Sequence, residues 1–312
     1  MKVLISSRSF GKIDSGAIEL LKEKGLEPVL NPYGRKLSEK EILDLSDDVV
    51  GIIAGTEQIS EKIISSNSQL KVISRYGIGL DNVDLKAAAE KKIIVYNTPE
   101  TPTVAVAEFT LSLILNLIKK IGNADRNLRK EEWKPETGNL LSGKTVGIIG
   151  LGRIGKKLAK FLAPFNVTIL AFEIKPDNEF LTKNKIKLAE LYDLISISDI
   201  ITIHLPLTEQ TKGIIGKKEM ESMKKNTLLI NTARGGLVDE KALYEALKNK
   251  TIAGAAIDVF ENEPDTGKLK ELDNVILTPH ISAYTIETRK QMEIEAVENL
   301  INGLKETNIL KI

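Results

Sequence analysis

Only two histidines occur in the chain, so candidates for a proton donor and acceptor near neutral pH are few. His204 ends the apolar run 200–204, and His280 follows the apolar run 275–277. Glu263 follows a third run, 255–259. A carboxylate beside an imidazole raises the imidazole pKa and fixes its tautomer, so Glu263 and His280 would form an acid/base pair if the fold brings them together. The spacing alone does not show that the two residues touch, and the alternative is that each is a solvated loop residue.

Arginine is scarce, with eight residues against 36 lysines, so each arginine is a candidate ligand for an acid. Arg234 follows the apolar run 227–231 and precedes two glycines, a setting that suits the close approach of a ligand. A guanidinium binds a carboxylate through two parallel hydrogen bonds, which lysine cannot do. Arg75 follows the run 72–74, where an ordinary surface turn is an equally good interpretation.

A glycine-rich segment, Gly150-Leu151-Gly152-Arg153-Ile154-Gly155, lies between an apolar run and a helical pattern. It matches the dinucleotide-binding fingerprint, with Glu173 at the end of the next apolar run, 18 residues after Gly155. The first glycine permits a tight turn, the second lets the backbone approach a pyrophosphate, and the third lets the helix pack on the strand. Glu173 would accept hydrogen bonds from the ribose hydroxyls, which favours NAD over NADP, although Lys175 weakens this preference. The alternative is a structural turn with an incidental glutamate.

These residues require a scaffold of parallel strands. Short β-branched runs alternate with helical stretches in two successive series, which predicts parallel sheets covered by helices. The first series has strand candidates at 3–5, 49–54, 72–74 and 93–96, and helix candidates at 15–24, 38–45, 61–67 and 85–91. The second has strand candidates at 145–149, 167–172, 200–204, 227–231, 255–259 and 275–277, and a helix candidate at 156–163.

The predicted fold class is α/β, with two Rossmann-like or flavodoxin-like parallel-sheet domains and a cleft between them. A helix predicted over 101–121 separates the two series, and the polar stretch 122–142, with the single tryptophan Trp133, follows it. The last predicted helix, 285–303, has no strand after it, so we expect it to return to the first domain. The domains would be 1–101 plus 285–312, and 102–284.

Composition narrows the class of protein. The 312 residues carry a formal net charge of +1, which argues against a nucleic-acid partner held by bulk charge. The absence of cysteine excludes disulfides, thiolate nucleophiles and cysteine-ligated metals, and no metal site is predicted. The N-terminal apolar run is too short for a signal peptide, and the apolar run 104–118 is too short to span a bilayer. We therefore expect a cytoplasmic protein without a membrane partner.

Five ordered motifs resemble those of the D-isomer-specific 2-hydroxyacid dehydrogenase family. They are Gly150-Leu-Gly-Arg-Ile-Gly155, His204-Leu-Pro-Leu-Thr208, Asn231-Thr-Ala-Arg-Gly-Gly236, Asp258-Val-Phe-Glu-Asn-Glu-Pro264 and Thr278-Pro-His280. Within the family, Arg75-Tyr-Gly-Ile-Gly-Leu-Asp-Asn-Val-Asp-Leu85 is most similar to the phosphoglycerate dehydrogenases. The resemblance implies an NAD-dependent enzyme acting on a D-2-hydroxy acid or 2-keto acid, with 3-phosphoglycerate and serine biosynthesis as the first candidates. It also implies a homodimer joined through 104–141, with Trp133 in that interface or in the core.

The resemblance assigns roles to the candidate residues. His280 would be the acid in ketone reduction and the base in alcohol oxidation, and Glu263 would keep it protonated enough to act near pH 7. Arg234 would hold the substrate carboxylate and polarise the carbonyl. The first domain would bind the substrate through Arg75 and the backbone N–H groups of Tyr76, Gly77 and Ile78. The second domain would bind NAD through Gly150, Gly152, Arg153, Ile154, Gly155, Glu173, His204, Pro206, Thr232, Ala233 and Asp258, the last matching the residue that binds the carboxamide.

The sequence departs from the family pattern in two places. No cation stands in Ala54-Gly55-Thr56, where phosphoglycerate dehydrogenases often carry a phosphate-binding arginine, so Arg75, Arg35 or Lys36 would have to replace it. No C-terminal regulatory domain follows, so feedback by a bound amino acid is not expected. The missing arginine favours the alternative of a glyoxylate, hydroxypyruvate or other 2-keto-acid reductase. A remote alternative is an NAD(H)-sensing corepressor resembling the C-terminal binding proteins, which would consume no NADH with a 2-keto acid.

Overall fold

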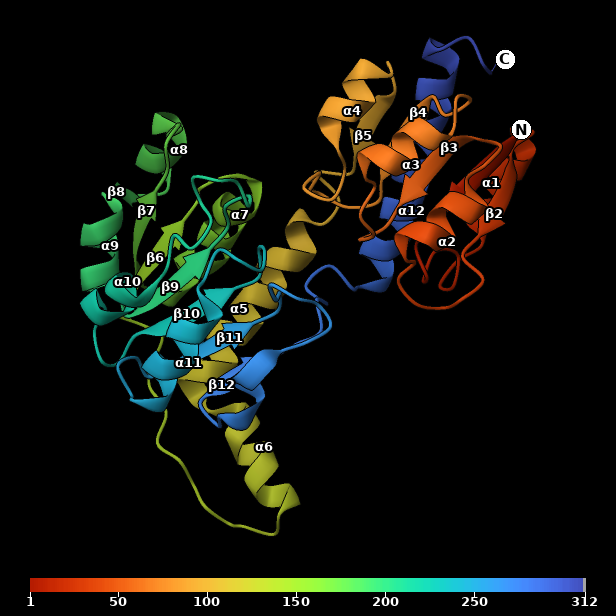
Figure 1. Ribbon diagram of the computed structural model, residues 1–312. Helices are drawn as coiled ribbons and strands as arrows, with labels where there is room; N and C mark the ends of the chain where they lie inside the picture. The colour runs from red at the N-terminus through yellow and green to blue at the C-terminus, as the bar shows by residue number, and fades with distance from the viewer. Residues whose placement is uncertain (311–312) are drawn as a thin grey trace. The chain divides into compact units, whose positions relative to one another are not determined.

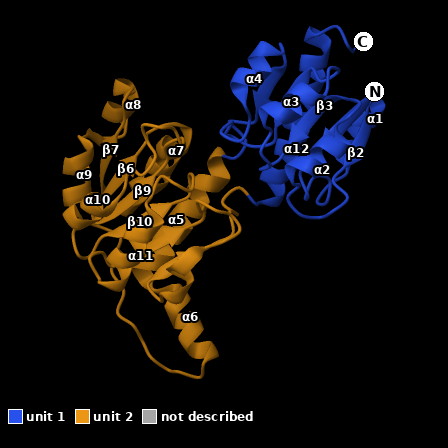
Figure 2. Cartoon of the chain, in the orientation of Figure 1, with its two compact units in different colours: residues 1–102, 284–312 blue, residues 103–283 orange. Residues whose placement is uncertain are grey.

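The computed structural model describes residues 1–310, and the chain forms two compact units (Figures 1 and 2). Unit 1 contains the chain up to Pro102 and again from Tyr284, and unit 2 is the continuous segment Thr103–Ala283. The chain therefore crosses between the units twice. The sequence predicted crossings next to residues 101 and 285, and the roles assigned to the two domains remain predictions.

Unit 1 is built on a five-stranded parallel sheet in the order β2-β1-β3-β4-β5. Its strands are β1 (Lys2–Ile5), β2 (Glu27–Leu30), β3 (Val49–Ala54), β4 (Val72–Arg75) and β5 (Ile94–Asn97). Strands β3 and β4 are buried along their whole length, because helices cover both faces of the sheet. The edge strand β2 was not predicted, since Pro28 and the exposed Glu27 and Leu30 leave no apolar run.

Helices divide the core of unit 1 between the two faces of its sheet. On one face, α1 (Gly16–Glu23) and α12 (Ile286–Glu306) bury Leu21, Val297 and Leu300. On the other, α2 (Glu39–Leu45), α3 (Glu61–Ser66) and α4 (Leu85–Glu90) bury Ile42, Ile63 and Ala88. The last helix of the chain therefore packs on the sheet that the N-terminal strands form.

Unit 2 is built on a seven-stranded parallel sheet in the order β12-β11-β10-β9-β6-β7-β8. Its strands are β6 (Thr145–Ile149), β7 (Thr168–Phe172), β8 (Lys187–Leu188), β9 (Ile200–Ile203), β10 (Leu228–Asn231), β11 (Gly254–Ile257) and β12 (Val275–Leu277). The strand order reverses between β6 and β9, which is the point where ligands bind in sheets of this kind. The predicted α/β class with two parallel sheets is confirmed.

Helices also cover both faces of the second sheet (Figure 1). One face is covered by α5 (Thr103–Lys119), α7 (Arg153–Leu162), the short 3-10 helix Ala163–Phe165 and α8 (Asn178–Lys183). The other is covered by α9 (Leu191–Ile197), α10 (Lys217–Ser222), α11 (Glu240–Lys248) and the 3-10 helix Gly267–Glu271. This double cover explains the near-continuous apolar runs of the central strands.

The segment after α5 differs from the expectation. The stretch predicted as a polar connection contains α6 (Ile121–Arg129), which extends from the end of α5 (Figure 1). None of the residues of α6 is buried. Trp133 is 86% exposed, so the interpretation of Trp133 as a core residue is wrong. Ile121, Leu128 and Leu140 are exposed as well.

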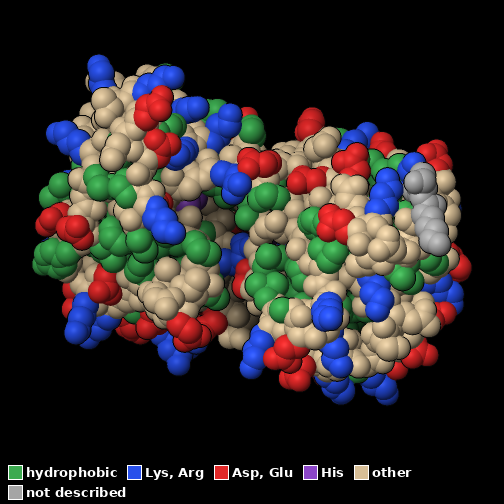
Figure 3. Space-filling view, turned by 90° about the horizontal axis from the view of Figure 1, so that it is seen from above, with side chains coloured by type: hydrophobic (Ala, Val, Ile, Leu, Met, Phe, Trp, Pro, Cys, Tyr) green, Lys and Arg blue, Asp and Glu red, His purple; other side chains and the backbone are tan. Residues whose placement is uncertain are grey.

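Charged side chains of both signs are interspersed over the face shown in Figure 3. Their mixture fits the formal net charge of +1. Within residues 1–310, none of the helices combines the length and the apolar character that a membrane span requires.

Candidate active site

Three neighbouring strands of unit 2 carry the three predicted catalytic residues at their ends. Arg234 follows β10, Glu263 follows β11 and His280 follows β12, and these strands are adjacent and parallel. Their carboxyl ends therefore lie on one edge of the sheet, where open α/β sheets bind ligands.

Glu263 and His280 form a direct pair. The Nδ1 of His280 lies 2.9 Å and 3.0 Å from the two carboxylate oxygens of Glu263. The same carboxylate accepts the backbone N–H of Phe260 at 3.3 Å, which fixes its orientation. The side chains of His280 and Glu263 are 36% and 32% exposed, so the imidazole remains accessible to a ligand. Sequence spacing left this pairing open, and the structure brings the two residues together.

Asp258 holds the loop that carries His280. Its carboxylate accepts the Thr278 hydroxyl at 2.7 Å, the Ile281 N–H at 2.9 Å and the Ser282 N–H at 3.0 Å. Its backbone carbonyl accepts the N–H of His280 at 2.8 Å. These bonds hold His280 at a φ of 55°, in the left-handed region that few non-glycine residues occupy. Asp258 is 0% exposed, and its contact with a carboxamide stays a prediction.

The loop that carries Arg234 is pressed against the loop that carries Glu263. A Cβ at Gly235 would lie 2.1 Å from the carbonyl oxygen of Phe260, so glycine is required for this approach. The Asn231 amide donates to the Arg234 carbonyl at 2.8 Å and closes the turn. The half-buried Arg234 guanidinium donates to the carbonyl of Ala233 at 2.7 Å, which orients the planar group at the strand edge.

The glycine-rich segment forms the turn from β6 into α7. Gly150 has a φ of 96°, and a Cβ at Gly155 would lie 2.3 Å from the Gly150 carbonyl oxygen. A Cβ at Gly152 would meet no atom within 4 Å, so the backbone there is open to a ligand. Arg153 and Ile154 begin α7, and no side chain caps the helix at Gly152. Its first N–H groups can therefore bind an anion, and the segment fits the pyrophosphate of NAD.

Glu173 places a carboxylate beside this turn. It follows β7 and accepts the Leu151 N–H at 2.8 Å and the Lys175 N–H at 3.0 Å. These two bonds fix Glu173 against the glycine loop. At this position we expect its carboxylate to accept hydrogen bonds from the ribose hydroxyls of NAD.

His204 lies in surroundings that differ from those of His280. Its Nε2 is 3.0 Å from the Thr202 hydroxyl, and its buried Nδ1 has no partner among residues 1–310. Burial lowers the pKa of His204 to about 3. The imidazole of His204 is therefore neutral near pH 7 and is no candidate for proton exchange there. The His204 carbonyl lies against Gly150, where a Cβ would be 2.7 Å from its oxygen.

The other predicted cofactor residues lie at the same sheet edge. Thr232 follows β10, and its hydroxyl lies 2.9 Å from that of Thr110 on α5. Ala233 is held in the turn of Arg234. Pro206 follows β9, and its carbonyl accepts the Thr211 hydroxyl at 2.6 Å. All of them belong to unit 2, together with the predicted catalytic residues.

Arg75 of unit 1 lies inside its loop. It is 7% exposed, its Nε donates to Asn82 at 3.2 Å, and its Nη1 donates to the carbonyl of Tyr76. A Cβ at Gly77 would lie 2.3 Å from the same Nη1, so the guanidinium packs directly against Gly77. The structure therefore shows Arg75 as an internal support of the loop, and its contact with a substrate stays a prediction.

Two of the three backbone N–H groups predicted to bind the substrate already donate hydrogen bonds within unit 1. The N–H of Tyr76 donates to Ala54 at 2.9 Å, and that of Gly77 donates to the Thr98 hydroxyl at 2.9 Å. The N–H of Ile78 meets no acceptor among residues 1–310, and the Ile78 carbonyl accepts the Asn97 amide at 2.7 Å. Ile78 is the member of the predicted set whose N–H remains available to a ligand.

A buried ion pair that the sequence did not single out supports the same loop. Arg289 and Glu293, 5% and 1% exposed, lie one turn apart on α12 at 3.7 Å. The Arg289 guanidinium lies 4.5 Å from the ring centre of Tyr76 and 4.6 Å from that of Tyr284. Burial raises the pKa of Glu293. An Arg and a Glu four residues apart are typical of a solvated helix face, so this buried pair could not be recognised from its spacing.

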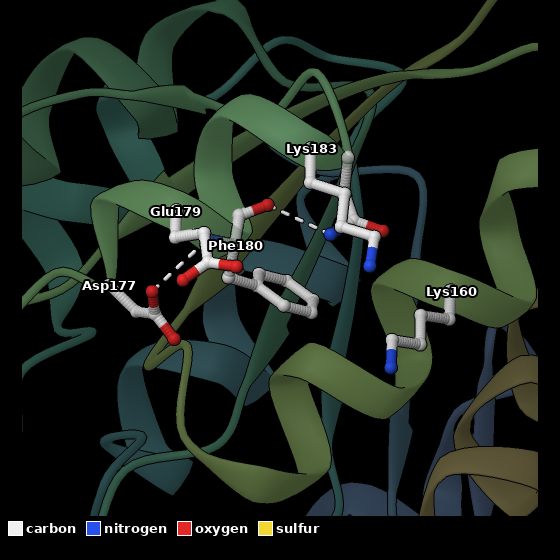
Figure 4. A pocket seen from close by; sticks show the side chains of 6 residues that line it. Lys160, Asp177, Glu179, Phe180 and Lys183 are labelled. Atoms are coloured by element: carbon white, nitrogen blue, oxygen red, sulfur yellow. Dashed lines mark hydrogen bonds between the residues drawn. The ribbon is translucent and has the colours of Figure 1, made fainter.

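A separate pocket of about 220 Å³ lies beside α8 (Figure 4). Its lining side chains are Lys160, Asp177, Glu179, Phe180, Lys183 and Asn184. Asp177 accepts the Phe180 N–H at 3.0 Å, caps α8 and pairs with Lys156 at 2.6 Å. None of the predicted site residues lines this pocket. In the described part of the chain, no three acidic or histidine side chains gather to hold a metal ion.

The parallel sheet with a glycine loop at its switch point is that of a dinucleotide-binding α/β protein. The model of the D-isomer specific 2-hydroxyacid dehydrogenase NAD-binding domain matches residues 111–282. The chain belongs to the D-isomer-specific 2-hydroxyacid dehydrogenase family.

Phosphoglycerate dehydrogenases and glyoxylate or hydroxypyruvate reductases match this chain at similar sequence identity. D-3-phosphoglycerate dehydrogenase of Archaeoglobus fulgidus is 36% identical over 98% of this chain and 58% of its own length. Glyoxylate reductase of Thermofilum pendens is 45% identical over 80% of this chain and 76% of its own. Hydroxypyruvate reductase of Thermotoga maritima is 37% identical over 94% of this chain and 96% of its own length. The chain thus spans between 53% and 60% of the length of four phosphoglycerate dehydrogenases that it matches.

Solved structures share the fold over both units. The TT0316 protein from Thermus thermophilus matches with a TM-score of 0.90 and 34% identity, over 98% of this chain and 97% of that chain.

Proposed function

We propose that this protein is an NAD-dependent oxidoreductase that transfers a hydride between nicotinamide and a D-2-hydroxy acid or 2-keto acid. The observation that carries the proposal is the Glu263–His280 pair, on the sheet edge that also holds Arg234. Ketone reduction needs a proton donor, a cation for the substrate carboxylate and a bound source of hydride. Unit 2 offers the first two beside a glycine loop that fits NAD.

His280 moves the proton in this mechanism. An ionised Glu263 accepts hydrogen bonds only, so the His280 Nδ1 carries a proton and is fixed by the pair. Nε2 is then the atom that gives a proton to the carbonyl oxygen in reduction and takes one from the hydroxyl in oxidation. Arg234 orients the carboxylate and stabilises the developing oxyanion. Bound NAD(H) supplies or accepts the hydride.

Replacement of Glu263 by Gln is expected to lower kcat on the order of 100-fold, because a neutral amide no longer stabilises the imidazolium. The Kd of NADH should stay unchanged, since Glu263 does not lie in the glycine loop. Steady-state kinetics and NADH fluorescence titration measure the two effects. The matched control is Glu261→Gln, an exposed residue of the same loop. Equal losses in both variants would show a general effect of charge on the loop.

Within this class, we propose 3-phosphohydroxypyruvate and 3-phosphoglycerate as the substrate pair, which places the protein in serine biosynthesis. The match to phosphoglycerate dehydrogenases over 98% of the chain supports this choice. The second candidate is a glyoxylate or hydroxypyruvate reductase. The lack of a cation in residues 54–56 favours it, as does the match to a hydroxypyruvate reductase at 37% identity over 94% of this chain.

The experiment is NADH oxidation with 3-phosphohydroxypyruvate, hydroxypyruvate, glyoxylate and pyruvate at matched concentrations. A kcat/KM highest for the phosphorylated acid supports the first candidate. A preference for an unphosphorylated acid supports the second and keeps the mechanism. Consumption of no NADH with any of the four acids contradicts the proposed activity.

We also propose a homodimer formed through α5, α6 and the segment up to Leu141. Ile121 and Leu128 are each 55% exposed and Trp133 is 86% exposed, and a partner copy would cover these apolar side chains. The solution mass should be about twice 34.4 kDa. Because Trp133 is the single tryptophan, its emission should shift to longer wavelength on dilution. A monomeric mass with Trp133 emission independent of concentration would contradict this interface.

A further inference from the structure

The loop after β1, residues 6–11, connects two loops that follow the neighbouring strands β3 and β4. At its start, the Ser6 hydroxyl accepts the N–H of Gly55 at 3.0 Å. A Cβ at Gly55 would lie 3.2 Å from the Ser7 Cα, so the two backbones are in contact. Near its end, the Phe10 ring meets the Tyr76 ring edge-on, with 5.6 Å between centroids. The loop is therefore fixed against both segments that the sequence analysis associated with the substrate.

Arg8 lies in the middle of this loop and is exposed. On one side, Ser7 contacts Gly55. On the other, the Ser9 hydroxyl bonds to Arg289, which stacks on Tyr76. Among residues 1–310, no carboxylate or other acceptor holds the Arg8 guanidinium. Its two neighbours in the chain are thus held against the loop at 54–56 and, through Arg289, against the loop at 75–79.

The guanidinium groups of the other arginines at this end of unit 1 already have partners within the protein. Arg75 donates to Asn82 and to a carbonyl inside its own loop. Arg289 is 5% exposed between two tyrosine rings. Arg35 binds both carboxylate oxygens of Glu41, at 2.9 Å and 2.6 Å. The pairing with Arg35 lowers the pKa of Glu41 to about 2, so this pair is ionised at neutral pH.

We propose that Arg8 binds the phosphate of a phosphorylated 2-keto acid, in place of the arginine that is absent from residues 54–56. This inference rests on the proposed function and names the group that recognises the substrate's distal end. Parallel strands bring the loops after β1, β3 and β4 to one edge of the sheet. A guanidinium matches two phosphate oxygens with parallel hydrogen bonds. Arg8 determines the choice between phosphorylated and unphosphorylated acids and takes no part in proton transfer.

The test compares Arg8→Ala and Arg8→Lys with the wild-type protein and with Lys12→Ala, an exposed cation just beyond the same loop. Each protein is assayed with 3-phosphohydroxypyruvate and with hydroxypyruvate, which differ in the phosphate. For Arg8→Ala we expect kcat/KM with the phosphorylated acid to fall about 10- to 100-fold, through KM. With hydroxypyruvate we expect less than about a twofold change. Arg8→Lys should retain part of the affinity, and Lys12→Ala should resemble the wild type.

Each remaining outcome overturns the inference in a distinguishable way. Equal losses on both substrates would show that Arg8 supports the loop and not the phosphate. An unchanged KM for the phosphorylated acid in Arg8→Ala would exclude Arg8 as its ligand. A wild-type preference for hydroxypyruvate would refute the phosphate site while leaving the oxidoreductase intact. A wild type inactive with both acids and with glyoxylate and pyruvate would refute the proposed function, and the inference with it.

Discussion

Replacement of His280 by Asn is expected to lower kcat about 100- to 10,000-fold, the range that general acid/base catalysis contributes. The loss follows because the asparagine amide cannot carry the exchanged proton, while Asp258 still holds the loop through backbone N–H groups. The Kd of NADH should change little, because residue 280 lies outside the glycine loop. Turnover measured by NADH absorbance and affinity measured by fluorescence titration separate the two quantities.

Asparagine is the suitable replacement at this position for a structural reason. His280 has a φ of 55°, and asparagine tolerates the left-handed region better than most residues. The variant should therefore fold with an unchanged melting temperature, which circular dichroism can check. Unchanged turnover in a folded His280→Asn protein would refute the mechanism. Loss of NADH binding would instead indicate that the loop itself contributes to the cofactor site.

Substitutions of Arg234 are expected to give graded losses. Arg234→Lys keeps the charge but loses the planar fork, and we expect kcat/KM for the 2-keto acid to fall about 10-fold. Arg234→Gln also loses the charge, and we expect a fall of about 100-fold or more. Because the arginine would bind the carboxylate and also stabilise the oxyanion, both KM and kcat should change.

The matched control for Arg234 is Lys217→Gln, whose ammonium pairs with Glu221 on α10 and whose side chain is 80% exposed. It removes the same charge from an exposed helix of unit 2 and should leave kcat/KM unchanged. If Arg234→Gln lost no more activity than Lys217→Gln, the carboxylate would have another ligand.

The architecture could be predicted because its determinants are local. Parallel strands covered on both faces are short apolar runs, and β3, β6 and β9 each stand out as one. The glycine loop is recognisable because each of its three glycines is required for a different reason: the turn, the approach of a ligand, and the packing of helix on strand. Elements without a buried apolar pattern were not predicted. The strand β2 lies at a sheet edge and contains Pro28, and α6 buries none of its residues.

The site could be predicted in its residue types but not in its contacts. Glu263 and His280 come from different strand ends, so their pairing depends on the order β11-β12, which no local pattern encodes. Arg75 has the type of a ligand, but its burial against Gly77 could not be predicted, because burial depends on the tertiary packing of the loop. Asp258 was predicted to bind the cofactor. The hydrogen bonds that its carboxylate accepts come from the loop that carries His280, and the sequence did not indicate them.

The return of α12 to unit 1 has a consequence for the order in which the protein folds during synthesis. Unit 2 is continuous and can complete its core while the chain is still attached to the ribosome. The sheet of unit 1 emerges first, but one of its faces stays uncovered until Val297 and Leu300 arrive. Leu300 closes on Gly51, where a Cβ would lie 2.6 Å from its Cδ1. Nascent unit 1 therefore exposes an apolar sheet face until α12 has been synthesised, and of the two units it has the greater need of protection from aggregation.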